Sequence, residues 1–390
     1  MFLHVPAIQK EQTMNCTNRA KIAIVAKFPL SYIIERGREP KGYHCVWLLT
    51  LHKLFQQQEQ YDIHWIVPDK SIKKARSEVL HGQTFHLLPK ARMTIGLCTR
   101  YVYDRWQICK TLKSINPDLV HAWGTEDCHG LAVSRFKGKK ILSIQGLLIA
   151  ISQRARMARF EQLQGRLYEA TTVKRYARIT VESEWGVDRV KELNSTSDVK
   201  RWEYAIPEYF YSAERTMSSV PTCVIAGSNT PVKNVRCALE AFSKPELANV
   251  TLYMAGVAPG AFPNLPSNII PLGFVPHEEM SKVLASAWAL VHPSLADTCP
   301  NIVKEARVMG IPAVVTHDCG AKQYIVNGKS GYVISPNNVD ELAEAVLAMV
   351  SNRELNIAMG EFDRERCRTA ISQDTMMKSL LNIYSSILNE

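Results

Sequence analysis

The stretch Val291–Val315, VHPSLADTCPNIVKEARVMGIPAVV, decides the fold that we expect for this chain. It starts at the end of an apolar run, Ala287–Val291, which is typical of a buried strand. A helix should follow from about Pro300, since proline lacks an N–H that the first turn does not use, and end at Gly310. Ile311–Val315 then has the β-branched composition of another strand. Strand, helix and strand in this order predict a βαβ unit of a parallel sheet.

Two carboxylates lie on either side of the predicted helix start. Asp297 precedes the helix at the carboxyl end of its strand, and Glu305 follows about two turns later. Ligands bind at this edge of an open parallel sheet, and a helix N-terminus near Cys299, Pro300 and Asn301 suits a phosphate. The arrangement suits a sugar nucleotide, whose hydroxyls bind carboxylates and whose diphosphate binds amides. An ordinary crossover with two surface carboxylates is the alternative.

The whole cassette resembles that of the family-4 retaining glycosyltransferases, the glycosyl transferases group 1 of GT-B architecture. Their pattern is Glu, seven residues, Glu and Ala, followed by Gly-x-Pro-Val-Val. The first acid here is Asp297, which reaches less far than Glu. The resemblance covers roughly residues 20–370 and is strongest over 220–345. The other matching positions are Glu305, Ala306, Gly310, Pro312, Val314 and Val315.

Strands and helices alternate along the chain and then restart after Pro221, which predicts an α/β fold of two doubly wound domains. The resemblance implies GT-B, with two Rossmann-like domains facing each other across a cleft. It also implies that the last helix, about Thr375–Leu388, crosses back to the first domain. The expected parts are an extension (1–19), an acceptor-binding domain (20–205), a linker (206–220), a nucleotide-sugar-binding domain (221–365) and C-terminal helices (366–390).

Composition indicates a globular protein that does not span a membrane. The chain is 46% hydrophobic and 22% charged, and no uninterrupted apolar run reaches the roughly 18 residues of a spanning helix. The first residues do not form a credible signal peptide, and Met14 is a possible start besides Met1. The ten cysteines show neither a CxxC pair nor metal-ligand spacing, so we expect reduced thiols, no metal and a cytoplasmic protein.

The net charge of +10 is unevenly distributed. Residues 1–200 carry +14, and residues 201–390 carry −4. A basic half favours peripheral binding to the anionic inner face of the plasma membrane. A solvated basic face without a partner is the alternative, and nucleic acid is not expected because no docking motif is present. The cations include Arg154, Arg156, Arg159 and Arg166, and an interfacial mixture with aromatic residues consists of Arg100, Tyr101, Tyr103, Arg105, Trp106 and Lys110.

The resemblance also implies further donor-binding residues. The family has Gly-Arg and then a lysine in the loop after the first strand of its second domain. This chain has Gly227, Ser228 and Lys233 there, so one cation is missing. A glycine loop near the diphosphate corresponds to Gly37 and Gly42, although a plain turn explains these glycines as well. The nucleotide-base pocket corresponds to Gly256, Gly273, Phe274 and Val275.

The acceptor side is less clearly marked. His121 ends a predicted strand, where the family often has His-x-His, and is either a catalytic residue or a core histidine. Trp123 occupies the second histidine position. Glu126 is a catalytic candidate that could bind or deprotonate the acceptor hydroxyl. The remaining acceptor-side candidates are His129, Gln145 and Gly146.

The expected activity is retaining transfer of a sugar from a nucleotide diphosphate, UDP- or GDP-linked, to a hydroxyl acceptor. The acceptor is expected to be a lipid-linked glycan intermediate of capsule, O-antigen or exopolysaccharide synthesis. The predicted catalytic set is Asp297, Glu305, Lys233, His121 and Glu126. The alternatives are a GT-B epimerase or phosphorylase and a catalytically inactive scaffold that binds sugar nucleotides.

Overall fold

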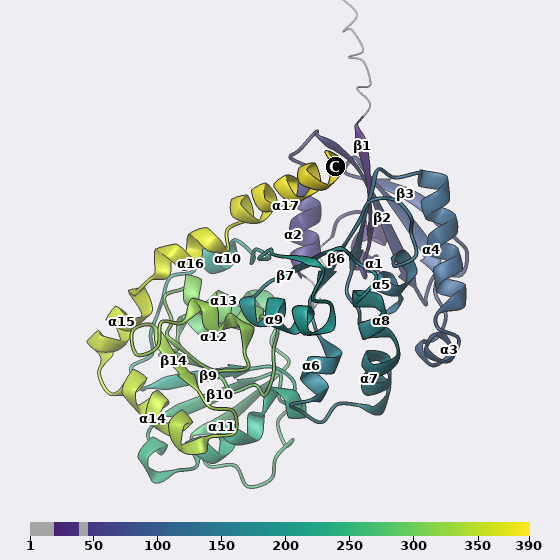
Figure 1. The fold of residues 1–390 in the computed structure, drawn as a ribbon. Helices are drawn as coiled ribbons and strands as arrows, with labels where there is room; N and C mark the ends of the chain where they lie inside the picture. Colours follow the sequence, from purple (N-terminus) through teal and green to yellow (C-terminus); the bar gives the residue numbers. More distant parts are fainter. Residues whose placement is uncertain (1–18, 39–45) are drawn as a thin grey trace, which may run out of the picture.

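The computed structural model describes residues 19–38 and 46–390 and shows two α/β domains (Figure 1). The first sheet has eight strands in the order β3-β4-β2-β1-β5-β6-β7-β8, all parallel to their neighbours except the antiparallel pair β3–β4. The strands are β1 (Ala20–Val25), β2 (Tyr61–Asp69), β3 (Arg76–Leu80), β4 (Gln83–Pro89), β5 (Leu119–Trp123), β6 (Lys140–Ile144), β7 (Arg178–Val181) and β8 (Asp198–Arg201).

The second sheet has six parallel strands in the order β11-β10-β9-β12-β13-β14. Its central strands are almost continuously apolar, as expected for strands that helices cover on both faces. The strands are β9 (Thr222–Ala226), β10 (Thr251–Ala255), β11 (Ile269–Gly273), β12 (Ala289–His292), β13 (Ala313–Thr316) and β14 (Gly331–Ile334).

Helices cover both sheets. Those of the first domain are α1 (Leu30–Ile34), α2 (Val46–Phe55), α3 (Met93–Cys98), α4 (Val102–Ile115), α5 (Cys128–Val133), α6 (Leu148–Ser152), α7 (Arg159–Gln164), the π-helix η1 (Gly165–Glu169), α8 (Ala170–Val173) and α9 (Glu184–Leu193). The linker and second domain contain α10 (Tyr209–Ser212), η2 (Pro231–Lys233), α11 (Val235–Phe242), η3 (Pro245–Leu247), α12 (His277–Ala285), α13 (Asn301–Val308), η4 (Gly320–Tyr324), α14 (Val339–Val350), α15 (Arg353–Glu361), α16 (Arg364–Ala370) and α17 (Gln373–Leu388).

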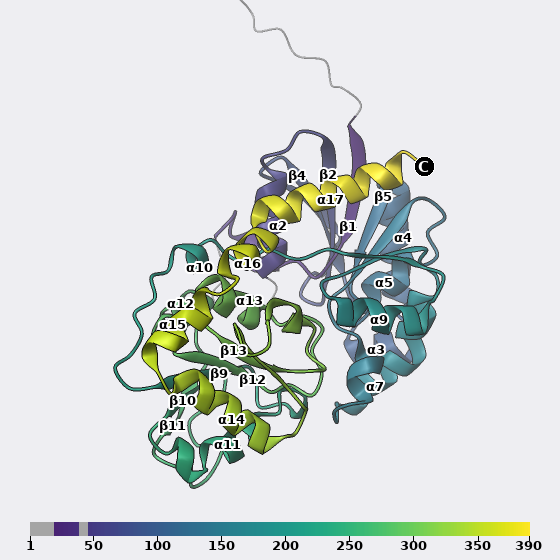
Figure 2. The same cartoon turned by 60° about the vertical axis from the view of Figure 1, so that its left-hand side comes forward.

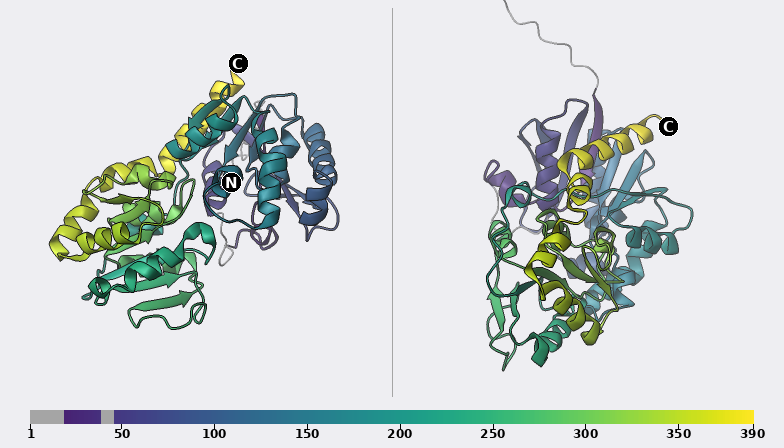
Figure 3. Two further views of the ribbon diagram at one scale, coloured as in Figure 1. Left: turned by 60° about the horizontal axis from the view of Figure 1, so that its bottom comes forward. Right: turned by 90° about the vertical axis from the view of Figure 1, so that its left-hand side faces the viewer.

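The predicted α/β architecture of two doubly wound domains is confirmed. The two domains and the C-terminal helices that join them are separated most clearly in Figure 3. A cavity of about 320 Å³ lies between them, lined by α2, the linker, the start of α12 and the start of α17. In the described part of the chain, no helix is both long and apolar enough to cross a bilayer.

The C-terminal helix α17 packs on the first domain (Figure 2). Its buried face includes Tyr384, whose hydroxyl is hydrogen bonded to His121 Nδ1 at 2.7 Å. His121 Nε2 is hydrogen bonded to Ser143 Oγ at 2.6 Å. His121 is fully buried, and burial lowers its pKa to about 3, so the ring is neutral at pH 7. The expected catalytic role of His121 is therefore wrong, because both ring nitrogens are used in the core.

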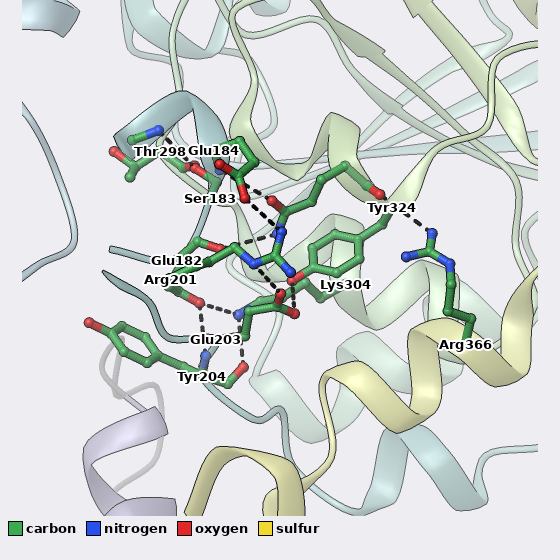
Figure 4. Close-up of polar contacts among 12 residues, drawn as sticks. Glu182, Ser183, Glu184, Arg201, Glu203, Tyr204, Thr298, Lys304, Tyr324 and Arg366 are labelled. Carbon is green, nitrogen blue, oxygen red and sulfur yellow. Dashed lines mark hydrogen bonds and ion pairs between the residues drawn. The ribbon is translucent and has the colours of Figure 1, made fainter. Parts of the chain in front are cut away.

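A buried polar contact joins the two domains (Figure 4). Lys304 in α13 is fully buried, and its Nζ donates to Glu182 Oε2 at 2.6 Å and to the Tyr204 carbonyl at 2.9 Å. Burial alone would lower the pKa of Lys304, but the Glu182 carboxylate raises it above its usual value, so the lysine stays charged. Beside this pair, Ser183 Oγ donates to the Thr298 carbonyl at 2.5 Å.

Close backbone approach and a second ion pair extend this contact. A Cβ at Gly320 would overlap both the Thr298 carbonyl oxygen and Ser183 Oγ, so only glycine fits there. Arg154, which we expected to face a membrane, instead pairs with Asp318 of the second domain at 2.8 Å. The domains therefore meet through loops that follow β7, β12 and β13, next to the cassette that first indicated the fold.

Candidate functional site

The loops that follow β9 and β12 bring Lys233 and Asp297 together at the carboxyl edge of the second sheet. Lys233 Nζ donates to Asp297 Oδ2 at 2.6 Å. Burial alone would raise the pKa of Asp297, but Lys233 and the nearby His292 lower it well below its usual range. Burial would likewise lower the pKa of Lys233, and Asp297 raises it. Both groups are therefore charged at neutral pH and form a preformed pair.

Three buried polar atoms near Asp297 have no hydrogen-bond partner within the described residues: His292 Nε2, Ser294 Oγ and Thr298 Oγ1. His292 Nε2 lies 3.3 Å from Asp297 Oδ2 without forming a well-aligned hydrogen bond. Unpaired buried polar groups are costly and rare in folded proteins. Three such atoms lie within the single segment His292–Thr298.

Glycine allows the neighbouring loops to approach one another. Gly256 has a positive φ of 89°, and a Cβ there would lie 2.7 Å from the Gly227 carbonyl oxygen. Gly227 in turn lies against the Lys233 side chain, because a Cβ added to this glycine would be 3.3 Å from Lys233 Cγ. The loop after β9 is thereby held against that lysine, while Ser228, at the usual arginine position, is exposed.

Helix α13 begins at Asn301, and Pro300 occupies the position before it. Cys299 and Pro300 are buried, and Asn301 is half-buried. The free N–H groups of the first turn therefore lie directly after Asp297 in the chain, where an anion would be stabilised. The predicted juxtaposition of a carboxylate, a lysine and a helix N-terminus is present in the structure.

Glu305 lies inside the second domain and is 2% exposed. His277 Nε2 donates to its Oε1 at 2.8 Å, and the other ring nitrogen is hydrogen bonded to the Tyr209 hydroxyl at 2.6 Å. A ribose that binds Glu305 would therefore share this carboxylate with His277. Sequence reasoning missed His277 and Tyr209, because their meeting depends on how α12 and the linker pack against α13. Val275, half-buried just before α12, lies next to this group.

We expect the His277–Glu305 pair to make stability depend on pH. Burial alone would lower the pKa of His277, but Glu305 raises it above its usual value of about 6.5. A raised folded-state pKa means that this stabilisation is fully present below about pH 6.5 and is lost as pH rises through the folded value. His277→Gln keeps a donor but does not titrate. The melting temperature of wild type minus that of His277→Gln should therefore be larger in mildly acidic than in alkaline buffer, and an equal difference in both would contradict the assignment.

The acceptor-side candidates lie at the ends of β5 and β6 in the first domain. Glu126 Oε1 accepts from the Gly146 N–H at 2.8 Å. The Gln145 amide oxygen, oriented toward two indoles, accepts from Trp47 Nε1 at 2.5 Å and from Trp123 Nε1 at 3.1 Å. The structure thus brings Glu126, Gln145 and Gly146 together. His129 is 3% exposed and lies behind them, so the expected direct contact of His129 with an acceptor is not supported.

The Glu126 side chain is exposed to solvent, yet its carboxylate also lies close to protein atoms. Burial among protein atoms raises its pKa to about 7, with a further contribution from the nearby Glu169. Solvent that reaches the exposed side chain limits the size of this rise. A cavity of about 120 Å³ opens beside the carboxylate, lined by Met93, Leu97, Tyr101, Glu126, Leu148, Phe160, Glu161 and Gln164. A carboxylate with a raised pKa beside a small cavity can bind a hydroxyl and exchange its proton.

One predicted donor-binding residue, Gly42, lies outside the described residues. Gly37, the other member of the expected glycine loop, has a positive φ of 98° and lies at the end of the three-residue turn after α1. The positive φ explains why position 37 is a glycine. The role of Gly42 stays a prediction.

Comparisons with known proteins agree with the fold. Residues 215–366 match the family model described as glycosyl transferases group 1. The capsular polysaccharide biosynthesis glycosyltransferase CapM of Staphylococcus aureus is 24% identical over 100 residues, which cover 26% of this chain and 26% of that protein. The chain thus matches about a quarter of the length of this curated relative.

Solved structures resemble nearly the whole chain. Sucrose-phosphate synthase from Thermosynechococcus elongatus has a TM-score of 0.73 at 11% identity, covering 95% of this chain and 100% of that one. Anabaena HepE, solved in complex with UDP-glucose, has a TM-score of 0.63 at 12% identity, covering 94% of this chain and 99% of that one. These similarities establish the GT-B fold predicted from the resemblance.

Proposed function

We propose, from the match of residues 215–366 to the glycosyl transferases group 1 family model, that this protein is a retaining glycosyltransferase. It transfers a sugar from a nucleotide-diphosphate donor, UDP- or GDP-linked, to a hydroxyl of a glycan acceptor in polysaccharide synthesis. The observation that supports this best is the preformed group of Lys233, Asp297 and the α13 N-terminus at the carboxyl edge of the second sheet.

The proposed donor contacts follow from charge. The diphosphate binds Lys233 and the free N–H groups of α13, because both stabilise the negative charge that develops when the sugar leaves. Asp297 then exchanges its bond to Lys233 for hydroxyls of the donor sugar. Glu305 binds the ribose hydroxyls after His277 moves or shares its hydrogen bond. The buried unpaired atoms His292 Nε2, Ser294 Oγ and Thr298 Oγ1 supply further polar contacts in the same segment.

The proposed reaction breaks the bond between the sugar C1 and the diphosphate oxygen and forms a bond between C1 and the acceptor oxygen on the same face. The acceptor proton passes to the departing phosphate oxygen. Glu126 binds the acceptor hydroxyl, and its raised pKa makes it the alternative proton acceptor. Gln145 and Gly146 fix the position of this side of the site. Enclosure of the donor between the two domains would limit its hydrolysis by water.

The acceptor that we propose is a lipid-linked glycan intermediate of capsule, O-antigen or exopolysaccharide synthesis. CapM, named for capsular polysaccharide biosynthesis, supports this class of pathway. A lipid-linked acceptor would place the protein peripherally on the inner face of the plasma membrane. The uneven charge of +14 over residues 1–200 supports contact between that half and an anionic membrane.

Nucleotide binding tests the donor site. At a concentration of about 100 times its dissociation constant, a nucleotide that binds the folded protein should stabilise it by about 2.7 kcal/mol. We expect one of UDP, GDP, dTDP and ADP to raise the melting temperature of wild type and to have little effect on Lys233→Ala. Lys244→Ala is the matched control, since Lys244 also bonds an aspartate, Asp340, but follows the end of α11, whereas Lys233 precedes its start. No shift with any nucleotide would refute the proposal.

Turnover separates an enzyme from an inactive sugar-nucleotide-binding protein. An enzyme should release nucleotide slowly from the correct sugar nucleotide even without an acceptor, because water reaches the donor in place of the hydroxyl. A clear melting shift without any nucleotide release over extended incubation would favour the inactive scaffold.

A further inference from the structure

Exposed apolar side chains gather at one end of the first domain. The described residues include sixteen large hydrophobic residues that are exposed, and half of them come from α3, the first turns of α4, α7 and η1. Trp106 is 57% exposed and Ile95 is 55% exposed. We name this surface the apolar face; it consists of Met93, Ile95, Val102, Tyr103, Trp106, Phe160, Leu163 and Leu167.

Hydrogen bonds join α3 and the start of α4 to η1 and α7, so the elements that carry the apolar face lie close together. Tyr101 OH donates to Gln164 Oε1 at 3.0 Å, and the Tyr168 hydroxyl donates to the Leu97 carbonyl. Figures 1 and 2 both show α3 and α7 side by side at the same end of the domain. Tyr101 itself is 2% exposed, so its expected place on an interfacial surface is wrong. Tyr101 links α3 to α7, because its N–H donates to the Gly96 carbonyl and its hydroxyl donates to Gln164.

Arginines surround this face. Arg92 and Arg100 flank α3, and Arg159 and Arg166 lie on α7 and η1, all four exposed. None of these four has an acidic partner within ion-pair distance in the part of the chain that the structure describes. Lys110 Nζ lies 5.2 Å from the Trp106 ring centroid. Unpaired cations around exposed aliphatic and aromatic side chains fit the surface of an anionic bilayer. The cations contact the anionic headgroups, and the apolar side chains enter the boundary with the acyl chains.

The cavity beside Glu126 opens on this face. Met93 and Phe160 belong both to the apolar face and to the cavity lining, and Glu126 lies on the same lining. The cavity thus connects a surface suited to lipid with the carboxylate proposed to bind the acceptor hydroxyl. Nucleic acid would match the arginines but not the eight exposed apolar side chains.

We propose that the apolar face and its arginines dock the protein on an anionic lipid bilayer and direct the cavity beside Glu126 toward that bilayer. The assignment of the cavity to a lipid-anchored acceptor rests on the proposed function, whereas docking itself does not. The hydroxyl of a lipid-linked acceptor could then enter the cavity beside Glu126 while the lipid part of the acceptor stays in the bilayer.

Vesicle binding by the full chain tests the docking. Wild type should sediment with vesicles of phosphatidylcholine and phosphatidylglycerol in equal parts, and at least about tenfold more weakly with phosphatidylcholine alone. Ile95→Ser combined with Trp106→Ser, and separately Arg159→Glu combined with Arg166→Glu, should each weaken binding to the mixed vesicles by about tenfold or more. The matched controls are Leu355→Ser with Ile357→Ser, exposed apolar residues of α15, and the exposed Arg236→Glu of α11; neither should change binding.

Three results would overturn the inference: wild type that does not bind mixed vesicles, face variants that bind as well as wild type, or controls that lose binding equally. Binding of duplex DNA or RNA that competes with vesicles and falls in the arginine variant alone would assign the charges to nucleic acid instead. Because the substituted side chains are exposed, the variants should fold normally, and their melting temperatures check this. Wild type that does not bind mixed vesicles but shows a nucleotide-induced melting shift refutes this inference only, whereas wild type that binds the vesicles but shows no nucleotide shift refutes the proposed function only.

Discussion

Replacing Lys304 by methionine should lower the free energy of unfolding by about 3–5 kcal/mol, because it leaves the Glu182 carboxylate buried without its partner. The lysine is fully buried and also donates to the Tyr204 carbonyl, so no water takes its place easily. The measurement is the urea midpoint of the first unfolding transition. The surface control Lys244→Met removes a solvent-exposed lysine–aspartate pair and should leave the urea midpoint almost unchanged.

The double variant Lys304→Met with Glu182→Leu tests the cause. If the cost comes from an unpaired buried charge, removing both charged groups should restore much of the stability that the single variant loses. If the double variant is as unstable as the sum of both single variants, the two side chains contribute independently and the ion pair is not the reason. The same variant reports on the domain contact, since the pair joins α13 to the segment after β7.

Lys233→Ala should reduce turnover of the sugar nucleotide about 100- to 1,000-fold, the usual effect of removing one group that stabilises developing negative charge. The loss should appear mainly in kcat, because the charge on the diphosphate grows as the sugar leaves. Nucleotide release from the correct donor is the assay, with Lys244→Ala as the control. A variant that keeps kcat and changes only KM would show that Lys233 holds the donor without assisting the reaction.

Asp297→Asn provides a matched comparison for this result. The substitution preserves the shape of the side chain but removes the charge that holds Lys233 at 2.6 Å. If Asp297 serves the donor sugar, turnover should fall as well. Turnover that rises would indicate that the aspartate only neutralises the lysine before the donor arrives.

The central strands were predictable because they are buried on both faces and therefore nearly continuously apolar. The pattern of apolar runs missed β4 and both edge strands of the first sheet, β3 and β8. β3 reads RSEVL and β8 reads DVKR, and charged residues on edge strands are typical because they discourage pairing with other chains. A search for apolar runs cannot find such strands.

Site residues were predictable where chain order alone brings them together. Lys233 and Asp297 each follow the carboxyl end of a strand, and β9 and β12 are neighbours in the sheet. No sequence pattern indicated that Glu305 would bond His277, or that Lys304, inside the same cassette, would be buried in a domain contact. His121 was ambiguous for the same reason: only the position of α17 shows that its ring is used by Tyr384.

The position of α17 also bears on how the protein is made. The core of the first domain includes Met376, Leu380, Ile383, Tyr384 and Ile387. The first domain therefore lacks part of its core until α17 has been synthesised. Domains generally fold as units during synthesis, the N-terminal one first. Here the second domain can complete its own core while the first still exposes apolar surface to the solvent around the ribosome. The first domain therefore cannot complete its core until the last residues of the chain have been synthesised.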